Sequence, residues 1–212
     1  MEILAHRGFW RTPEEKNSST AIYRAFENGF GIETDIRDYR GQLVISHNVA
    51  EEGALPAEEM FQAYVQFGKP GTLALNVKAD GIQVLLEPLL EKYGIEKYFL
   101  FDMSVPELIV NDSRGLTYFT RHSDVEDSCV MYDRASGVWM DSFYDFHWLS
   151  VENMQKHIGA GKTICIVSPE LHGQAHLETW NTLKENHLSD LDSVILCTDY
   201  PDRAKEYFYG KD

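Results

Sequence analysis

Residues 31–48 read GIETDIRDYRGQLVISHN. The first part predicts a buried strand over residues 31–36, and the glycine that follows marks a turn into a second short strand over residues 42–46. Glu33 and Asp35 stand two positions apart on the first strand, so both carboxylates point to the same face. Two carboxylates directed at one small volume repel each other unless a cation or a shared proton lies between them.

The rest of the chain repeats a strand followed by a helix. The predicted strands cover residues 3–6, 31–36, 72–78, 98–102, 117–120, 138–141, 163–167 and 194–198. The predicted helices cover residues 19–28, 56–67, 82–93, 106–112, 129–134, 151–158, 174–186 and 202–208. Strict alternation implies parallel strands joined by right-handed crossovers. We therefore predict an α/β fold, a single (β/α)8 TIM barrel over residues 1–212, with a short β-hairpin after the second strand and little insertion.

Charge limits the partners that this chain can bind. Its 19 Lys and Arg residues face 34 Asp and Glu residues, a formal net charge of −15. Such a balance repels nucleic acid and anionic membrane surfaces, so a phosphate group needs a local cluster of cations or a metal. No run approaches the roughly 18 apolar residues of a membrane span, and the first residues do not form a secretory signal. We expect a cytoplasmic protein that does not insert into a membrane, with a small-molecule partner; the sequence does not predict the oligomeric state.

Polar residues gather at the carboxyl ends of the predicted strands, where a TIM barrel places its active site. They are His6, Arg7, Glu33, Asp35, His47, Asn76, Lys78, Asp102, Arg121, His122, Asp141, Glu170 and Asp199. Packing among polar side chains inside the barrel would account for any one of them. The group contributed by the first three units, however, combines two histidines, two carboxylates and two cations, which points to phosphodiester chemistry.

Each member of that group has a chemical reason to be there. Oxygen ligands from the two carboxylates favour one hard divalent ion, Mg²⁺ or Ca²⁺. Arg7 and Lys78 would neutralise the oxygens of a bound phosphate. The imidazoles of His6 and His47 would act as acid and base near neutral pH.

Several of these motifs also resemble the glycerophosphodiester phosphodiesterase family. The motifs are AHRG at residues 5–8, Asn17-Ser18 before a helix, GIETDI at residues 31–36, GQLVISHN at residues 41–48 and CTDYPDRA at residues 197–204. The resemblance implies a TIM barrel that hydrolyses glycerophosphodiesters with one divalent metal. It implies His6 and His47 as the acid and base pair, Arg7 as a phosphate contact, and Glu33 and Asp35 as metal ligands. In that family a hydroxyl of the substrate attacks phosphorus, so no Ser or Cys nucleophile is required.

The chain also departs from the family pattern. Asn76 stands where the family usually has a third acidic ligand, so the expected metal site of Glu33, Asp35 and Asn76 has one negative charge fewer. The residue after His47 is asparagine instead of aspartate. We hypothesise that Asp102 or Glu170 replaces the missing charge, next to the metal directly or through a water. The alternative is that each of them only holds a neighbouring loop.

The function expected from the sequence is a metal-dependent phosphoric diester hydrolase acting on a glycerophosphodiester-type substrate. Two alternatives stay open. The first is a non-catalytic barrel that binds a phosphorylated ligand, for which the exchange at Asn76 is the motive. The second is a lyase-like phosphodiesterase that stops at a cyclic phosphate.

Overall fold

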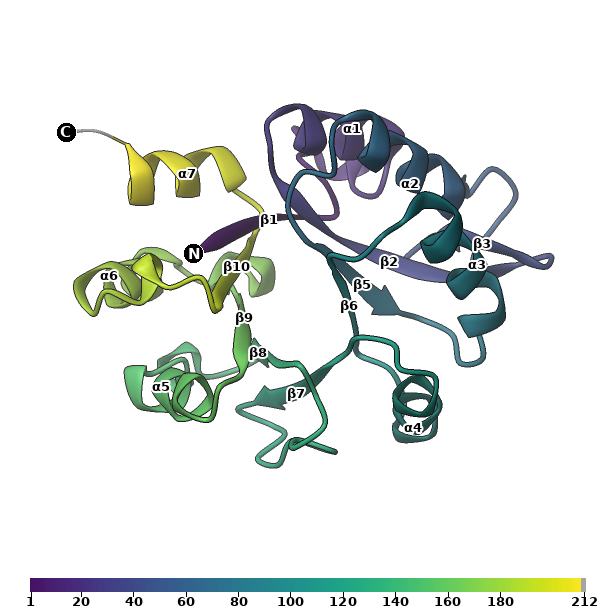
Figure 1. Cartoon of the computed structure of the whole chain (residues 1–212). Helices are drawn as coiled ribbons and strands as arrows, with labels where there is room; N and C mark the ends of the chain where they lie inside the picture. Colours follow the sequence, from purple (N-terminus) through teal and green to yellow (C-terminus); the bar gives the residue numbers. More distant parts are fainter. Residues whose placement is uncertain (211–212) are drawn as a thin grey trace. The chain divides into compact units, whose positions relative to one another are not determined.

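The computed structural model describes residues 1–210 as two compact units, shown in Figure 1. The N-terminal unit is Ala5–Tyr118, and the C-terminal unit joins Met1–Leu4 to the chain from Phe119 onward. Strands and helices alternate along most of both units, as the sequence predicts. The boundary between the units falls within the first strand, so the single domain over residues 1–212 stays a prediction.

The N-terminal unit carries a parallel sheet with an antiparallel extension. Its elements are β1 (Glu2–His6), which ends in this unit, η1 (Pro13–Glu15), α1 (Ser19–Glu27), β2 (Gly31–Tyr39), β3 (Gln42–Ile45), β4 (Leu55–Pro56), α2 (Ala57–Gln66), β5 (Leu73–Val77), α3 (Gln83–Tyr93), β6 (Tyr98–Phe101) and α4 (Val105–Ser113). β5 pairs in parallel with β2 and β6, whereas β3 runs antiparallel to β2 as the predicted hairpin. The short strand β4, which the sequence did not predict, extends this hairpin by pairing with β3.

Local signals in the sequence account for where these helices begin and end. The hydroxyl of Ser18 accepts a hydrogen bond from the backbone of Ala21 at the start of α1, and Ser104 caps α4 in the same way. Gly94 ends α3 in the left-handed conformation, at φ +56°. In Figure 1, α1, α2 and α3 lie in succession along one side of β2 and β5. These helices cover a strand pair that is buried almost throughout and that carries Glu33, Asp35 and Asn76 among its apolar residues.

Besides the start of β1, the described part of the C-terminal unit holds a run of parallel strands, β7 to β10. Its elements are β7 (Phe119–Ser123), β8 (Gly137–Asp141), η2 (Phe146–Trp148), α5 (Val151–Gly159), β9 (Thr163–Val167), η3 (Pro169–His172), α6 (Leu177–Glu185), η4 (Leu188–Asp190), β10 (Val194–Thr198) and α7 (Pro201–Tyr209). β8 lies between β7 and β9, and β9 pairs in turn with β10. β9 and β10 have the bounds that their apolar runs predict.

Two predictions for this unit are wrong. Residues 129–134 form turns instead of a helix, and Met131 among them adopts φ +52°, which an α-helix does not allow. The strand expected over residues 117–120 begins at Phe119 and continues to Ser123. Arg121 and His122 therefore lie within β7 and not in the loop that follows it. In the same unit, α6 begins at Leu177, later than expected, because η3 and Gly173 at φ +73° precede it.

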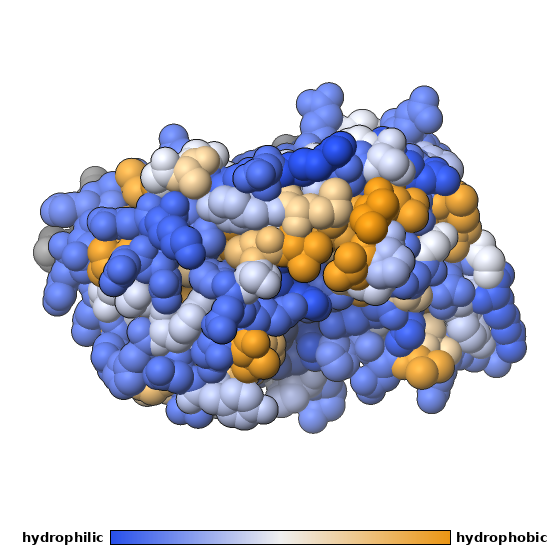
Figure 2. Space-filling model, turned by 90° about the horizontal axis from the view of Figure 1, so that it is seen from below, coloured by the Kyte–Doolittle hydropathy of each residue, from blue (hydrophilic) through white to orange (hydrophobic). Residues whose placement is uncertain are grey.

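Surface hydropathy agrees with the acidic composition. The face seen in Figure 2 is mainly hydrophilic, with its apolar side chains in several small groups. Among residues 1–210, no helix combines the length and the hydropathy needed to cross a bilayer.

Candidate active site

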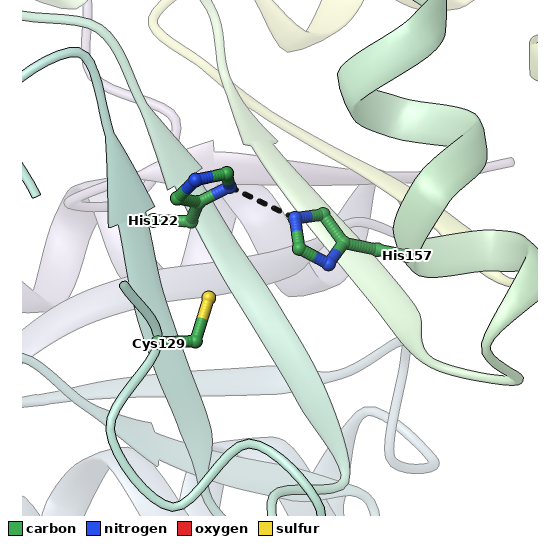
Figure 3. Close-up of side chains that lie close together, drawn as sticks. All are labelled: His122, Cys129 and His157. Atoms are coloured by element: carbon green, nitrogen blue, oxygen red, sulfur yellow. Dashed lines mark hydrogen bonds between the residues drawn. The ribbon is translucent and has the colours of Figure 1, made fainter. Parts of the chain in front are cut away.

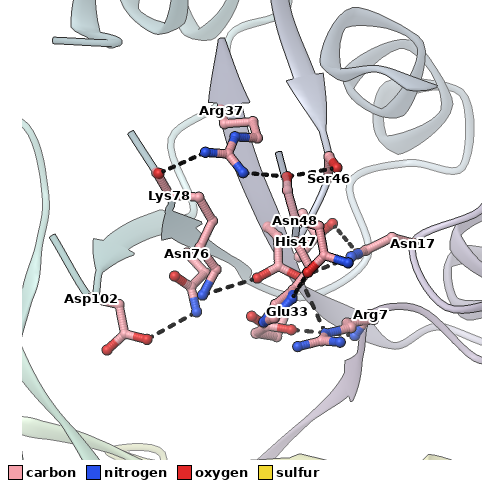
Figure 4. A network of polar contacts seen from close by, with 12 residues as sticks. Arg7, Asn17, Glu33, Arg37, Ser46, His47, Asn48, Asn76, Lys78 and Asp102 are labelled. Atoms are coloured by element: carbon pink, nitrogen blue, oxygen red, sulfur yellow. Dashed lines mark hydrogen bonds and ion pairs between the residues drawn. The ribbon is translucent and has the colours of Figure 1, made fainter. Parts of the chain in front are cut away.

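Asp35 is the centre of a polar network in the N-terminal unit (Figure 4). Its side chain is fully buried, and Oδ2 accepts a hydrogen bond of 2.8 Å from Nδ2 of Asn17. Arg7 Nε lies 3.1 Å from Oδ2, and Lys78 Nζ lies 3.3 Å from Oδ1. Two cations and an amide thus compensate the desolvation of one buried carboxylate.

Glu33 is as deeply buried as Asp35 but has weaker cationic partners. The backbone nitrogen of Arg7 donates to its carbonyl oxygen over 2.8 Å and to its Oε2 over 3.3 Å, and His6 Nε2 lies 3.8 Å from Oε2. Burial raises the pKa of Glu33 well above its ordinary value, and the nearby charge of Asp35 raises it further, against the opposing charges of Arg7 and Lys78. Glu33 therefore favours its protonated form unless a further cation comes close.

The backbone after β1 explains why an HRG sequence occurs here. Arg7 adopts φ +55° and Gly8 φ +86°. Gly8 packs against the first turn of α1. A Cβ on Gly8 would lie 2.7 Å from the backbone carbonyl carbon of Ala21, so no larger residue fits at position 8. Phe9 continues this close approach with a backbone hydrogen bond of 2.9 Å to Ala21. The turn directs the Arg7 guanidinium to Asp35 while its backbone nitrogen faces Glu33.

Asn76 lies beside Asp35, because the two residues are partners in the parallel pairing of β5 and β2. Its Nδ2 donates to Oδ2 of Asp102 over 3.0 Å. Its Oδ1 is buried and has no hydrogen-bond partner within residues 1–210. Asp102 follows β6 at φ +65°, a left-handed conformation that is costly for a residue other than glycine and that concentrates at functional sites.

These donor atoms fit a hard divalent cation. Asp35 Oδ1 and Asn76 Oδ1 are both buried without a hydrogen bond, and Glu33 adds a second carboxylate whose burial disfavours its charge. Carboxylate and amide oxygens are the ligands that Mg²⁺ and Ca²⁺ take from proteins. A cation among these oxygens would give Asn76 Oδ1 a partner and would join Lys78 beside Asp35 Oδ1.

His47 belongs to the loop after β3 and is exposed. Its Nδ1 lies 3.0 Å from Oδ1 of Asn48. Together with Arg7 and Asn17, it lines an open, polar cavity of about 590 Å³. Its imidazole thus shares one cavity with the guanidinium that reaches Asp35.

Two residues that hold this site together were not predicted from the sequence as site residues. Asn17 bridges neighbouring residues of β2, since it donates to Asp35 and its Oδ1 accepts from Thr34 Oγ1 over 2.8 Å. Arg37 donates to the backbone oxygen of Asn48 and, over 3.4 Å, to that of Lys78. Arg37 could have been found from the sequence, because it stands two residues after Asp35 and so lies on the same face of β2.

Within the N-terminal unit, direct contacts join several of the predicted site residues. Direct contacts link His6, Arg7, Glu33, Asp35 and Lys78 into one network and Asn76 to Asp102 beside it. Glu170 belongs to the C-terminal unit. There its carboxylate accepts hydrogen bonds from Ser168, from Thr198 and from the backbone nitrogen of Asp199 at 3.1 Å. These three hydrogen bonds satisfy the buried carboxylate of Glu170 and hold it against the end of β10.

Comparison with solved structures identifies the fold. A provisionally assigned glycerophosphodiester phosphodiesterase from Galdieria sulphuraria superposes with a TM-score of 0.72 at 18% identity, over 98% of this chain and 97% of the other. The glycerophosphodiester phosphodiesterase from Agrobacterium tumefaciens gives a TM-score of 0.69 at 17% identity, over 98% of each chain. A phosphodiesterase from Oleispira antarctica, solved with its product sn-glycerol-3-phosphate, gives 0.69 at 14% identity, over 98% of this chain and 96% of the other.

No protein-family model and no curated protein sequence matches the chain. The structural likeness extends over almost the full length of the chain and of its neighbours. The predicted α/β TIM-barrel fold is therefore confirmed, and it is the fold of the family whose motifs the sequence resembles.

Proposed function

We propose that this chain is a phosphoric diester hydrolase that acts on a small glycerophosphodiester-type substrate with the help of one divalent metal ion. The observation that carries the proposal is the environment of Asp35. One buried carboxylate holds both Arg7 and Lys78, next to Glu33 and the unpaired Oδ1 of Asn76. The fold supports it, because glycerophosphodiester phosphodiesterases share this fold, and a phosphodiesterase with the same fold was solved with its product sn-glycerol-3-phosphate.

Glu33, Asp35 and Asn76 are the residues that would hold the metal ion. When bound, Mg²⁺ or Ca²⁺ would polarise a phosphoryl oxygen and stabilise the charge that develops on it. Asp102 would act on Asn76, since its carboxylate accepts from the amide nitrogen and so fixes the direction of the amide oxygen.

Arg7 and Lys78 would bind the phosphate. Both side chains are about three-quarters buried, at 24% and 22% exposure, and Asp35 fixes their positions. Long cations with their charged ends held in place lose little freedom on binding an anion. They form a small positive centre on an acidic protein, which suits one phosphodiester at a time and not an extended polyanion.

His47 and His6 would transfer the protons. The Oδ1 of Asn48 can only accept, so a neutral His47 carries its proton on Nδ1 and has Nε2 available as a base. One histidine would take the proton of the attacking hydroxyl as the new O–P bond forms. The other would protonate the oxygen of the alcohol that leaves as the old P–O bond breaks. The cavity that His47 shares with Arg7 is large enough for a glycerophosphodiester.

Incubation of the full chain with a panel of glycerophosphodiesters, with Mg²⁺, with Ca²⁺ or with EDTA, tests the proposal. Phosphorus NMR should show a phosphomonoester product that EDTA abolishes. Accumulation of a cyclic phosphate would identify the lyase-like alternative. Binding of the panel without turnover under every metal condition would contradict hydrolysis and leave a phosphorylated-ligand-binding protein.

A further inference from the structure

A second cluster of metal-ligating side chains lies in the C-terminal unit (Figure 3). It consists of His122 on β7, Cys129 in the segment between β7 and β8, and His157 on α5. One potential ligand atom of each residue lies within 4.8 Å of the other two. Figure 3 shows the sulfur of Cys129 directed at the pair of imidazoles, whose facing nitrogens, Nδ1 of His122 and Nε2 of His157, are 2.9 Å apart.

Each imidazole also has a partner outside the pair. The hydroxyl of Tyr132 lies 3.0 Å from Nδ1 of His157, and the backbone of Asp127 hydrogen-bonds the ring of His122. Metal-ligating histidines show this arrangement, with one nitrogen held by a hydroxyl or carbonyl and the other presented to the ion. The 2.9 Å contact between the two imidazoles is a hydrogen bond, so one inner nitrogen carries a proton, which a cation bound between the rings would displace.

Coordination of a metal ion takes the neutral imidazole and the thiolate, so binding releases protons. One thiolate and two imidazoles are a donor set for Zn²⁺, unlike the oxygen atoms of the candidate active site.

The segment from residue 124 to residue 136 contains turns and bends but no helix or strand. It replaces the helix that this unit of the fold would otherwise have, and only Ala135 within it is buried. Polar contacts attach it to β7: Arg121 and Ser123 bind residues 125 and 126, and Thr120 Oγ1 donates to the backbone oxygen of Val130 at 2.8 Å. Burial of apolar surface thus contributes little to holding the segment in place.

We propose that His122, Cys129 and His157 bind one Zn²⁺ ion, with a water as the fourth ligand. The ion fastens the helix-free segment to β7 and α5. This site is distinct from Glu33, Asp35 and Asn76 in its residues and in the metal that it prefers, so it stands whether or not the chain hydrolyses phosphodiesters.

Titration of the metal-free full chain with Co²⁺, which reports on zinc sites through its absorption spectrum, tests the site. We expect one equivalent to give the thiolate-to-cobalt charge-transfer band and the visible bands of a four-coordinate ion, and Zn²⁺ to displace it. Cys129→Ser should abolish the charge-transfer band, whereas Asp35→Asn in the other site and His187→Gln on the exposed surface should retain it. A missing charge-transfer band in the wild type, or its persistence in Cys129→Ser, would overturn the proposal.

Limited proteolysis gives a second readout that needs no variant. Zn²⁺ should slow cleavage within residues 124–136 at least about tenfold, because the cross-linked segment opens less often. Addition of EDTA should restore the faster cleavage. An unchanged cleavage rate would overturn the structural role of the ion.

Discussion

The side-chain amide of Asn76 donates a hydrogen bond to Oδ2 of Asp102, and the amide oxygen is buried without a hydrogen-bond partner in residues 1–210. Because a carboxylate can only accept, Asp102 determines which end of the amide faces it. The carboxylate next to position 76 is thus that of the residue after the next strand, β6, and we propose that it replaces the charge missing there. The charge of Asp102 also acts on Glu33, whose pKa it helps to raise.

Asn76→Glu should therefore have opposite effects with and without metal. The added carboxylate should tighten Ca²⁺ or Mg²⁺ binding about tenfold, the equivalent of about 1.4 kcal/mol. Without metal it should lower the melting temperature, because the new charge faces Asp102 and Glu33. Calorimetric titration and thermal melts with and without Ca²⁺ measure both effects.

Asn76→Gln is the matched control for this variant, because it has the size of Glu and the charge of Asn. It should neither bind Ca²⁺ or Mg²⁺ more tightly than the wild type nor have a lower melting temperature without metal. Unchanged or weaker affinity in Asn76→Glu would argue that residue 76 does not lie at the metal.

Because the pKa of Glu33 is raised in the folded protein, the free energy of unfolding should depend on pH. The folded state holds this proton more tightly than the unfolded state does, so the free energy of unfolding falls as pH rises from 4.5 toward the folded pKa. Glu33→Gln removes that loss. In EDTA at pH 7 the variant should be more stable than the wild type by at least about 1 kcal/mol, or about 2–4 °C in melting temperature.

Urea denaturation at two pH values checks the sign. Below pH 4.5 both states of the wild type carry the proton, so the advantage of Glu33→Gln should vanish there. Glu52→Gln, at an exposed position, should behave as the wild type at both pH values. A wild type that is more stable than Glu33→Gln at pH 7 would contradict the assigned environment of Glu33.

His6→Ala and His47→Ala should each lower turnover at least about 100-fold, the usual cost of removing a general acid or base. Circular dichroism should show that both variants keep the fold. The His47→Ala variant should be the less perturbed of the two, because His47 is exposed. His187→Ala, another exposed histidine, should keep the wild-type rate. Near wild-type turnover in either of the first two variants would refute the catalytic assignment.

Sequence alone was sufficient where a local signal determines the structure. The same-face placement of Glu33 and Asp35 follows from the period of a strand, and β9 follows from its apolar run. Contacts that join distant segments were not visible. Arg37 binds backbone oxygens from the hairpin loop and from the residue after β5, and Cys129 meets histidines from β7 and α5. Nor was the turn over 129–134 visible, because its apolar residues have helical spacing although Met131 adopts φ +52°.

Gly8 provides the sharpest test of how the HRG turn is built. Gly8→Ala would place a methyl group 2.7 Å from the backbone of Ala21 and force a residue with a side chain to φ +86°. The left-handed conformation costs about 1–2 kcal/mol, and the overlap adds about 1–3 kcal/mol. Gly29→Ala isolates the first cost, because Gly29 has φ +78° and no atom within 4 Å of the added Cβ. Urea denaturation should show the larger loss of unfolding free energy in Gly8→Ala. Its turnover should fall as well, because Arg7 directly precedes Gly8. Equal losses in the two variants would mean that α1 moves away from the added methyl group at no cost.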